Sequence, residues 1–278
     1  MANGPGPILI TGCSSGIGAA IAARLVGRGH TVWATARRPQ TLSVLADGGA
    51  RTVALDVTDE ASMRAAVDTV IAEDGRIGAL VNNAGYGEYG AIEDVAIERV
   101  RRQFETNVLG LARMCQLVLP SMRAAKRGRI VNIGSMGGRL TFPYGGYYHA
   151  TKHAVEAISD ALRYEVAQFG IQVSLLEPGL ISTEFGDTIS STMGDATQHD
   201  SPYRDQAMAF DKASADLYGN RLLSVGPDAV ARVVERALTV RRPLARYVVP
   251  ERTRALIATR ALLPGRAWDA VLRASVRP

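Results

Sequence analysis

The sequence predicts one α/β domain with a parallel β-sheet covered by helices on both faces. Short apolar segments rich in β-branched residues alternate with longer helical patterns along the chain of 278 residues. Such alternation produces right-handed βαβ crossovers, which place consecutive strands parallel to one another. The strand segments are almost continuously apolar, as expected for strands that are buried on both faces. A glycine-rich turn separates the first strand from the first helix.

Seven apolar segments are short enough to be strands and are bounded by polar or glycine-containing turns. In order they read PILIT (7–11), TVWATA (31–36), RTVALD (51–56), ALVNN (79–83), RIVNIG (129–134), IQVSLLE (171–177) and ARYVV (245–249). The segments between them have apolar residues at helical spacing, which predicts helices near residues 16–28, 59–74, 97–125, 147–169 and 226–240.

Residues 182–220 interrupt this alternation. They are rich in Ser, Thr, Asp, Gly and Met and have little strand character, so they predict a long irregular segment that acts as a substrate lid. Their apolar and aromatic side chains favour a bulky apolar substrate, and these are Phe185, Met193, Tyr203, Met208, Phe210 and Tyr218. No repeat, low-complexity tract or linker composition divides the chain, so residues 1–278 are expected to form a single domain.

Composition places the protein among cytoplasmic globular proteins. Hydrophobic residues make up 47% of the chain and charged residues 21%, and no apolar run approaches the roughly 18 residues of a membrane span. The start of the sequence lacks the charged segment of a secretory signal. Cys13 and Cys115 are far apart and match no metal-ligand spacing, so we expect a reduced compartment, no disulfide and a packing role for Cys13. No metal site is predicted.

The net charge of +5 is a property of the C-terminal part. Residues 221–278 contain 12 arginines and 4 acidic residues, which leaves residues 1–220 with a net charge of −3. A nucleic-acid partner is therefore not predicted. The basic tail, residues 250–278, mixes arginines with apolar residues at helical spacing. A helix packed on the body with solvated arginines is the favoured interpretation, and contact with an acidic surface or lipid headgroups is the alternative.

The first strand and helix are joined by TGCSSGIG, residues 11–18. Glycines at positions 12, 16 and 18 allow a tight turn and a close approach to a ligand, and the helix N-terminus directs N–H groups toward a phosphate. The spacing G-x-x-x-G-x-G differs from the usual G-x-G-x-x-G, and the absence of a following lysine excludes a Walker A loop. The alternative is an ordinary tight turn between a strand and a helix.

Five motifs in register resemble the short-chain dehydrogenase/reductase family over residues 7–185. They are TGCSSGIG, NNAG at 82–85, Asn107, Ser135 with Tyr148 and Lys152, and PGLIST at 178–183. The resemblance implies a Rossmann-type doubly wound parallel sheet and an oxidoreductase that moves a hydride between a nicotinamide coenzyme and the carbonyl or secondary alcohol of a small-molecule substrate. It also implies a homodimer or homotetramer joined through the helices near 97–125 and 147–169.

The end of the second strand predicts which coenzyme is preferred. Ala36 stands where family members that prefer NAD carry an aspartate, and Arg37 and Arg38 follow it directly. An arginine can hold the 2′-phosphate of NADP with paired, charge-assisted hydrogen bonds. NADP(H) is therefore predicted, with Arg37 the stronger candidate; the alternative is two solvated arginines at a helix start.

The resemblance assigns the other coenzyme contacts to residues that follow the first, third, fourth and sixth strands and to the predicted catalytic pair. Among them, Asp56 could instead cap the helix near residue 59, and Asn83 is expected to tie neighbouring strands together. The assigned residues are Gly12, Ser14, Ser15, Gly16, Ile17, Gly18, Asp56, Val57, Asn83, Ala84, Gly85, Tyr148, Lys152, Pro178, Gly179, Ile181 and Thr183.

Four residues are predicted to carry the reaction. Tyr148 and Lys152 are four apart and share one helix face, so a lysine ammonium there is expected to lower the pKa of the tyrosine that exchanges a proton with the substrate oxygen. Ser135 follows the fifth strand, where the ligand crevice of such a sheet lies, and can donate to the developing oxyanion. The resemblance gives Asn107 a water that links Lys152 to solvent.

The neighbouring residues receive other roles. Tyr147 has Thr151 four residues on and is expected to line the substrate pocket or to pack, and His149 and His153 are read as structural. The predicted function is an NADP(H)-dependent reduction of a carbonyl or oxidation of a secondary alcohol. A non-catalytic NADPH-binding sensor is the alternative, and the presence of all four predicted catalytic residues disfavours it.

Overall fold

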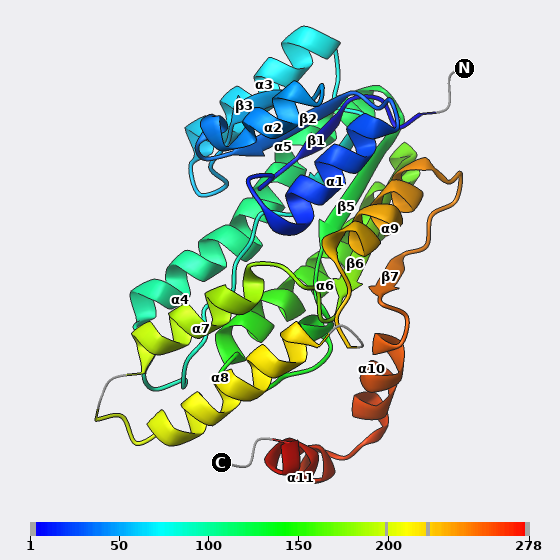
Figure 1. Ribbon diagram of the computed structural model, residues 1–278. Coiled ribbons are helices and arrows are strands. Elements are labelled where there is room, and N and C mark those ends of the chain that lie inside the picture. The colour runs from blue at the N-terminus through cyan, green and yellow to red at the C-terminus, as the bar shows by residue number, and fades with distance from the viewer. Residues whose placement is uncertain (1–3, 198–199, 221–222, 276–278) are drawn as a thin grey trace.

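Figure 1 shows the computed structural model, which describes residues 4–197, 200–220 and 223–275. Seven strands form one parallel sheet in the order β3-β2-β1-β4-β5-β6-β7, with helices on both faces. The predicted doubly wound sheet is thereby confirmed. The strands are β1 (Ile8–Ile10), β2 (Val32–Ala36), β3 (Arg51–Ala54), β4 (Ala79–Asn82), β5 (Gly128–Ile133), β6 (Ile171–Pro178) and β7 (Arg246–Val249).

Helices connect the strands and extend beyond them. The α-helices are α1 (Gly16–Gly27), α2 (Ser43–Asp47), α3 (Glu60–Asp74), α4 (Ile97–Phe104), α5 (Leu111–Ala124), α6 (Gly146–Val166), α7 (Phe185–Ala196), α8 (Arg204–Gly219), α9 (Pro227–Thr239), α10 (Thr253–Leu262) and α11 (Gly265–Ser275). Shorter helical turns are η1 (Pro39–Leu42), η2 (Glu105–Gly110), η3 (Met136–Gly138) and η4 (Ala167–Phe169).

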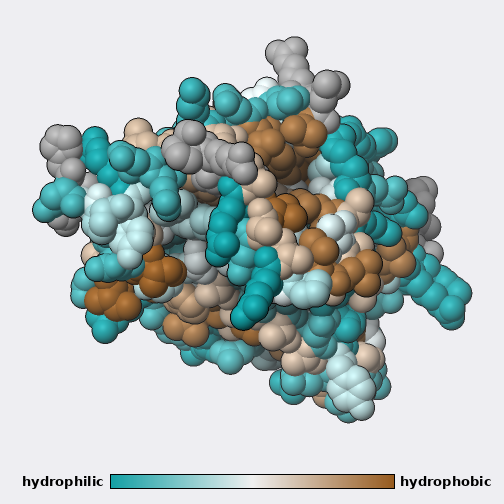
Figure 2. Space-filling model, turned by 90° about the horizontal axis from the view of Figure 1, so that it is seen from below, coloured by the Kyte–Doolittle hydropathy of each residue, from teal (hydrophilic) through white to brown (hydrophobic). Residues whose placement is uncertain are grey.

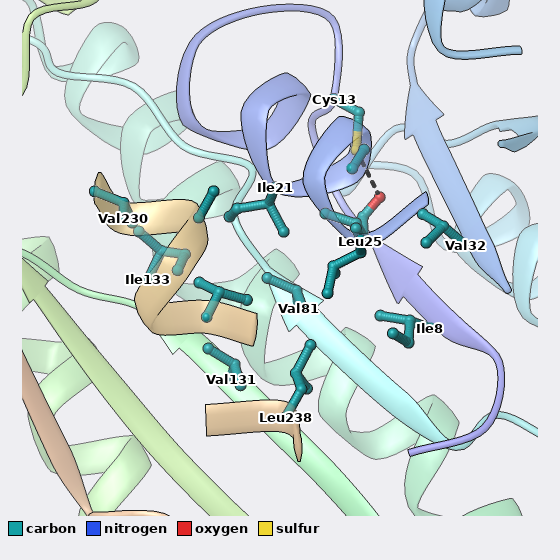
Figure 3. Close-up of a cluster of buried hydrophobic side chains, with 14 of the residues drawn as sticks. Ile8, Cys13, Ile21, Leu25, Val32, Val81, Val131, Ile133, Val230 and Leu238 are labelled. Carbon is teal, nitrogen blue, oxygen red and sulfur yellow. Dashed lines mark hydrogen bonds between the residues drawn. The ribbon is translucent and has the colours of Figure 1, made fainter. Parts of the chain in front are cut away.

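Alternate residues of the buried strands face two separate cores. Ile8 and Ile10 of β1 face the core beneath α1 and α9, whereas Leu9 faces the core beneath α3, α5 and α6. In Figure 3, Val81 of β4 and Val131 of β5 lie among apolar side chains of α1 and α9. Both faces of the sheet are therefore buried, which explains why the strands read as continuous apolar runs.

Cys13 packs at the edge of the first core, as expected. Its Sγ donates to the carbonyl of Ile10 at 3.4 Å, a contact drawn in Figure 3. Cys115 is also a free, buried thiol. Burial raises the pKa of each thiol to about 12, so neither carries the thiolate that redox chemistry requires.

The strand order reverses beside β1. The chain runs from β1 outward through β2 to β3 and then returns to β4, which pairs with the other side of β1. The helical connections that follow β1 and β4 consequently lie on opposite faces of the sheet, with a crevice at the carboxyl ends of the strands. Open α/β sheets bind their ligands in such a crevice.

The single helix predicted over residues 97–125 is interrupted. Helices α4 and α5 are joined by the π-helical turn η2, which contains Asn107. At Gly110 a Cβ atom would lie 2.5 Å from the carbonyl oxygen of Val57, so the backbone of η2 packs directly on the loop after β3. The widened turn lets the helix keep that close contact while it presents Asn107 to the interior, and π turns are common at functional sites.

The segment 182–220 is helical, so the irregular lid predicted there was wrong in its structure. Helices α7 and α8 bury Ile189, Met193, Ala207 and Phe210 against Tyr148 and Tyr89. The high content of Ser, Thr and Gly gives this segment a weak intrinsic helix propensity, and burial of its apolar face supplies the missing stability. Residues 198–199 of the predicted lid lie outside the described residues.

The basic tail folds against the body as two helices, α10 and α11. Trp268 of α11 is buried with its ring 6.3 Å from that of Phe142, and the guanidinium of Arg260 lies 5.7 Å from the Trp268 ring centre. Residues 276–278 of the predicted tail lie outside the described residues. Within the ranges described, no helix is long and apolar enough to cross a membrane.

Strand β7 is fastened to the sheet by a cluster of charges around Arg246. Its guanidinium donates to Glu177 of β6 at 2.9 Å and also pairs with Glu156 and Asp160 of α6. Glu156 and Glu177 are both buried, and burial raises the pKa of Glu156. Arg246 is therefore the main cation beside two carboxylates that water hardly reaches, and Arg139 lies 3.6 Å from the Glu177 carboxylate as a second cation.

Replacing Arg246 by methionine is expected to destabilise the protein by about 3 kcal/mol, because the buried Glu156 loses its ion-pair partner and Glu177 keeps the longer contact with Arg139 at 3.6 Å. Arg163→Met is the matched control, since Arg163 pairs with the same Asp160 at the surface and should cost less than about 1 kcal/mol. Urea unfolding of both variants measures the difference, and equal midpoints would contradict the assigned role.

Candidate active site

A cavity of about 1030 Å³ opens at the carboxyl ends of the strands. One end lies at the turn after β1, and the other reaches apolar side chains of α8 and α10. The predicted site residues that line it are Gly12, Ser14, Ser15, Gly16, Ile17, Gly18, Arg37, Asp56, Val57, Asn83, Ala84, Gly85, Ser135, Tyr148, Lys152, Pro178, Gly179, Ile181 and Thr183. Of the residues assigned from the sequence, only Asn107 and Arg38 are not among those that line this cavity.

The turn after β1 has the backbone that its glycines predict. Gly12 and Gly16 have φ angles of +71° and +56°, in the left-handed region that favours glycine. At Gly18 a Cβ atom would lie 2.1 Å from the carbonyl oxygen of Gly12, so only glycine allows the turn to close. Ser15 precedes α1 without capping it through its side chain, which leaves the first N–H groups of α1 directed at the cavity. This backbone fits the phosphates of a dinucleotide.

Asn83 holds this turn in place. Its side-chain amide donates to the carbonyls of Thr11 at 3.0 Å and Gly12 at 2.8 Å. In return, the Thr11 hydroxyl accepts hydrogen bonds from the backbone N–H groups of Asn83 and Ala84, each at 3.0 Å. These bonds join the loops after β1 and β4 across the reversal of strand order, as the sequence predicted for Asn83.

The two arginines after β2 have different surroundings. Arg37 lines the cavity and is exposed, whereas Arg38 lies outside it, and its carbonyl accepts a hydrogen bond from the Thr41 hydroxyl at 2.7 Å. The described carboxylates form no ion pair with Arg37. Its guanidinium is therefore available to an anionic group in the cavity.

The structure contradicts the capping role that was the alternative for Asp56, and its contact with the coenzyme stays a prediction. Asp59, not Asp56, caps α3, because its carboxylate accepts from the backbone N–H groups of Ala61 and Ser62. The Asp56 carboxylate accepts from the N–H and hydroxyl of Thr58 at 2.9 and 2.8 Å. Asp56 is thereby oriented at the rim of the cavity.

Ser135, Tyr148 and Lys152 meet on one side of the cavity. Ser135 follows β5, and its hydroxyl acts to lower the pKa of the Tyr148 phenol. The Ser135 Oγ also accepts from the N–H of Gly137 at 3.0 Å, which fixes its rotamer. The Nζ of Lys152 donates to the carbonyl of Ile133 at 3.0 Å and lies 5.8 Å from the centre of the Tyr148 ring.

Burial governs the ionisation of this pair. It raises the pKa of the Tyr148 phenol to about 12, with the hydrogen bond to Ser135 acting in the opposite direction. Burial also lowers the pKa of Lys152 to about 8. The expectation that Lys152 lowers the pKa of Tyr148 is therefore wrong for the protein alone, since the lysine is itself desolvated and bonds to a backbone carbonyl.

Asn107 lies behind the cavity wall. Its amide nitrogen donates to the Tyr86 carbonyl at 2.8 Å and to the Thr151 hydroxyl at 3.1 Å, and its Oδ1 accepts from the Tyr86 N–H at 3.0 Å. These bonds engage the amide on both sides, so the side chain anchors the Tyr86 loop to α6. The role of holding a water between Lys152 and solvent stays a prediction for Asn107.

Three residues of α6 that surround the catalytic pair have structural contacts. The Tyr147 hydroxyl donates to the Ile92 carbonyl at 3.2 Å, and its ring packs near Val95, away from the cavity. His149 lines the cavity, its Nδ1 lies 3.1 Å from the Gly137 carbonyl, and burial lowers its pKa to about 4. The imidazole is therefore neutral at pH 7, with Nδ1 donating. His153 bonds only within its helix.

The apolar end of the cavity contains residues that the sequence did not single out. Tyr89 packs on the Tyr148 ring at 5.6 Å between centres, and Phe142 and Leu256 come from a loop and from α10. None of these lies in a motif with fixed spacing. The long segment predicted as a lid does contribute, through Phe185, Phe210 and Tyr218. Among the residues described, no cluster of His, Cys, Asp or Glu could hold a metal ion.

Comparison with known proteins agrees with this geometry. The family model described as short chain dehydrogenase matches residues 7–194. A 3-ketodihydrosphingosine reductase of Bacteroides thetaiotaomicron is 46% identical over 183 residues, which is 66% of each chain. An NADPH-dependent 3-dehydrocapnine reductase of Ornithobacterium rhinotracheale is 34% identical over 95% of this chain and 94% of that one. A crystal structure of a short-chain dehydrogenase from Streptomyces avermitilis, 32% identical, covers 97% of this chain and 98% of that one with a TM-score of 0.78.

Gly18→Ala is expected to weaken dinucleotide binding at least about tenfold, because the new methyl group displaces the Gly12 carbonyl and opens the turn. Gly27→Ala, at the other end of α1, meets nothing within 4 Å and should bind normally. Calorimetric titration with NADPH compares the variants. Unchanged binding by a folded Gly18→Ala protein would show that the turn does not hold the dinucleotide.

Proposed function

The chain belongs to the short-chain dehydrogenase/reductase family, and from this premise we propose that it reduces the ketone of an apolar substrate with NADPH. One observation carries the proposal. Ser135, Tyr148 and Lys152 converge on a single cavity that begins at the glycine turn and ends among apolar side chains. A dinucleotide with its phosphates at α1 and a substrate at the apolar end would both contact these three residues.

The side chains divide the chemistry of the reduction between them. Bound NADPH would supply the hydride to the carbonyl carbon. The Tyr148 phenol, which is protonated at neutral pH because burial raises its pKa, donates its proton to the carbonyl oxygen. Ser135 donates a hydrogen bond to the same oxygen. One N–H of the Lys152 ammonium donates to the Ile133 carbonyl. The other two are available to the coenzyme and to the proton supply of Tyr148.

The form of the cavity supports a long or bulky apolar substrate. Beyond Tyr148 its wall includes Phe142, Phe185, Phe210, Leu217 and Leu256. Apolar walls of this kind bind by excluding water and select on shape rather than on charge. The names of two relatives specify 3-ketodihydrosphingosine and 3-dehydrocapnine, so a 3-keto compound with a long apolar chain is the first substrate to test.

NADPH is favoured over NADH by the charges near the adenosine end. Arg37 lies in the cavity wall without a carboxylate partner among the described residues, and Ala36 puts no acidic side chain at the end of β2 to repel a 2′-phosphate. A charge-assisted pair between guanidinium and phosphate is the strongest single contact that this end of the cavity offers. The NADPH dependence named for the relative from Ornithobacterium is consistent with this preference.

Tyr148→Phe is expected to lower the rate of ketone reduction by about 10²–10⁴-fold, the usual contribution of a general acid. The assay follows NADPH absorbance with a panel of 3-ketodihydrosphingosine, a steroid ketone, a medium-chain ketone and butanone. Tyr147→Phe is the matched control, since it removes a neighbouring hydroxyl that points away from the cavity.

The proposal fails if no carbonyl in the panel is reduced or if Tyr148→Phe retains full activity. Tight NADPH binding without any turnover would instead favour the non-catalytic sensor.

Arg37→Ala is expected to raise the KM for NADPH about tenfold or more while leaving the KM for NADH nearly unchanged, because only NADPH carries the 2′-phosphate. Arg38→Ala removes an equally exposed arginine that does not line the cavity and should change both values less than about twofold. Steady-state kinetics with both coenzymes distinguishes the two arginines. Equal effects of the two substitutions would refute the assignment of the 2′-phosphate to Arg37.

A further inference from the structure

The turn between α10 and α11, the last two helices of the described chain, exposes apolar side chains. Helix α10 ends at Leu262, and α11 begins at Gly265. The side chain of Leu262 is 84% exposed, and Pro264 beside it is exposed as well. Arg260 donates to the Leu263 carbonyl at 3.4 Å, a weak bond that helps to shape the turn. One exposed leucine is ordinary on a protein surface, and it indicates a partner only together with the charges beside it.

Arginines dominate the charge of the helices on both sides of this turn. Residues 251–275 contain five arginines and two acidic residues, and no ion pair joins any of the five to a described carboxylate. The five are Arg252, Arg254, Arg260, Arg266 and Arg273. Arg254 and Arg266 are exposed on either side of Leu262 along the chain. The turn thus combines an exposed leucine with flanking helices that carry a net positive charge and arginines without carboxylate partners.

The same helices form part of the wall of the active-site cavity. Leu256 of α10 lines the cavity and is 38% exposed, so it has one face toward the substrate end and one toward solvent. Trp268 of α11 packs on Phe142, which also lines the cavity. Figure 1 shows α10 and α11 running down one side of the molecule to its lower end, and Figure 2 shows apolar side chains gathered between hydrophilic ones on that lower face.

We propose that the turn between α10 and α11 docks on the surface of an anionic lipid bilayer, with Leu262 inserted among the headgroups. Basic residues near an anionic leaflet each strengthen binding about fivefold, and an apolar side chain adds to this when it enters the interface. A second copy of the chain is a poorer occupant, because it would bring the same arginines against one another. The protein would lie on the bilayer, as its described helices do not span one.

Docking in this way has a consequence for the substrate. Leu256 lies about one and a half turns before Leu262 on α10, so the apolar end of the cavity would open close to the bilayer surface. A long-chain ketone could then pass from the membrane into the cavity without crossing bulk water. This consequence rests on the proposed reaction, whereas the docking surface does not.

Sedimentation with sucrose-loaded vesicles tests the surface on the full chain. Vesicles of phosphatidylcholine with one quarter phosphatidylglycerol should pellet the protein at 0.1 M salt, and vesicles of phosphatidylcholine alone should not. Leu262→Ser and Arg266→Gln should each weaken binding about fivefold. Val44→Ser is the matched control, because Val44 is 81% exposed on α2 and should bind like the unchanged protein.

Absence of pelleting with anionic vesicles, or equal pelleting by Leu262→Ser and Val44→Ser, would overturn the proposal. Sedimentation velocity without vesicles gives the competing outcome, since a dimer that Leu262→Ser dissociates would assign the turn to a second copy. NADPH consumption with a water-soluble ketone, measured on the same variants, should be unchanged. If the unchanged protein does not reduce the water-soluble ketone, this result contradicts the proposed reaction and not the docking surface.

Discussion

The active site depends on how tightly the turn after β1 is held against the end of β4. Asn83 donates to two carbonyls of that turn, and Thr11 accepts two N–H groups in return. The bonds are partly buried and reciprocal, so neither loop can shift without leaving polar groups unpaired. Gly18 completes the contact, because its missing side chain lets α1 begin directly over the Gly12 carbonyl. The dinucleotide end of the cavity is therefore shaped by backbone, and its rigidity comes from the sheet.

The reacting end depends on buried side chains rather than on backbone. This difference explains which of its properties could be predicted from the sequence. The four-residue spacing of Tyr148 and Lys152 and the strand before Ser135 suffice to place these residues together, because helix and sheet geometry is regular. Their ionisation could not be predicted in the same way. It depends on burial by Tyr89, Phe185 and other side chains that no periodic pattern connects to α6. Spacing predicted proximity, and only the packed structure shows that desolvation opposes the charged forms of both groups.

The segment from α7 to α8 illustrates the same limit for the fold. The alternation of strands and helices predicted the sheet, since each strand carries its own apolar signature. Residues 185–219 carry no such signature, because their helices are stabilised by Ile189, Met193 and Phe210 packing on residues of the cavity wall. Those contacts serve two purposes at once. The side chains that hold the segment in place also exclude water from Tyr148, so opening this segment would rehydrate the phenol and change its acidity.

Helix α10 contacts both the coenzyme end and the substrate end of the cavity. Thr253, the first residue of α10, is buried, and its Oγ1 lies where a Cβ on Gly179 would come within 2.4 Å. Gly179 lines the cavity after β6. One end of α10 therefore contacts the loop that follows β6, while Leu256, about one turn later, contacts the substrate end. Movement of the exposed turn after Leu262 would therefore act on a helix that contacts both ends of the cavity. The basic tail is in this sense a structural part of the site.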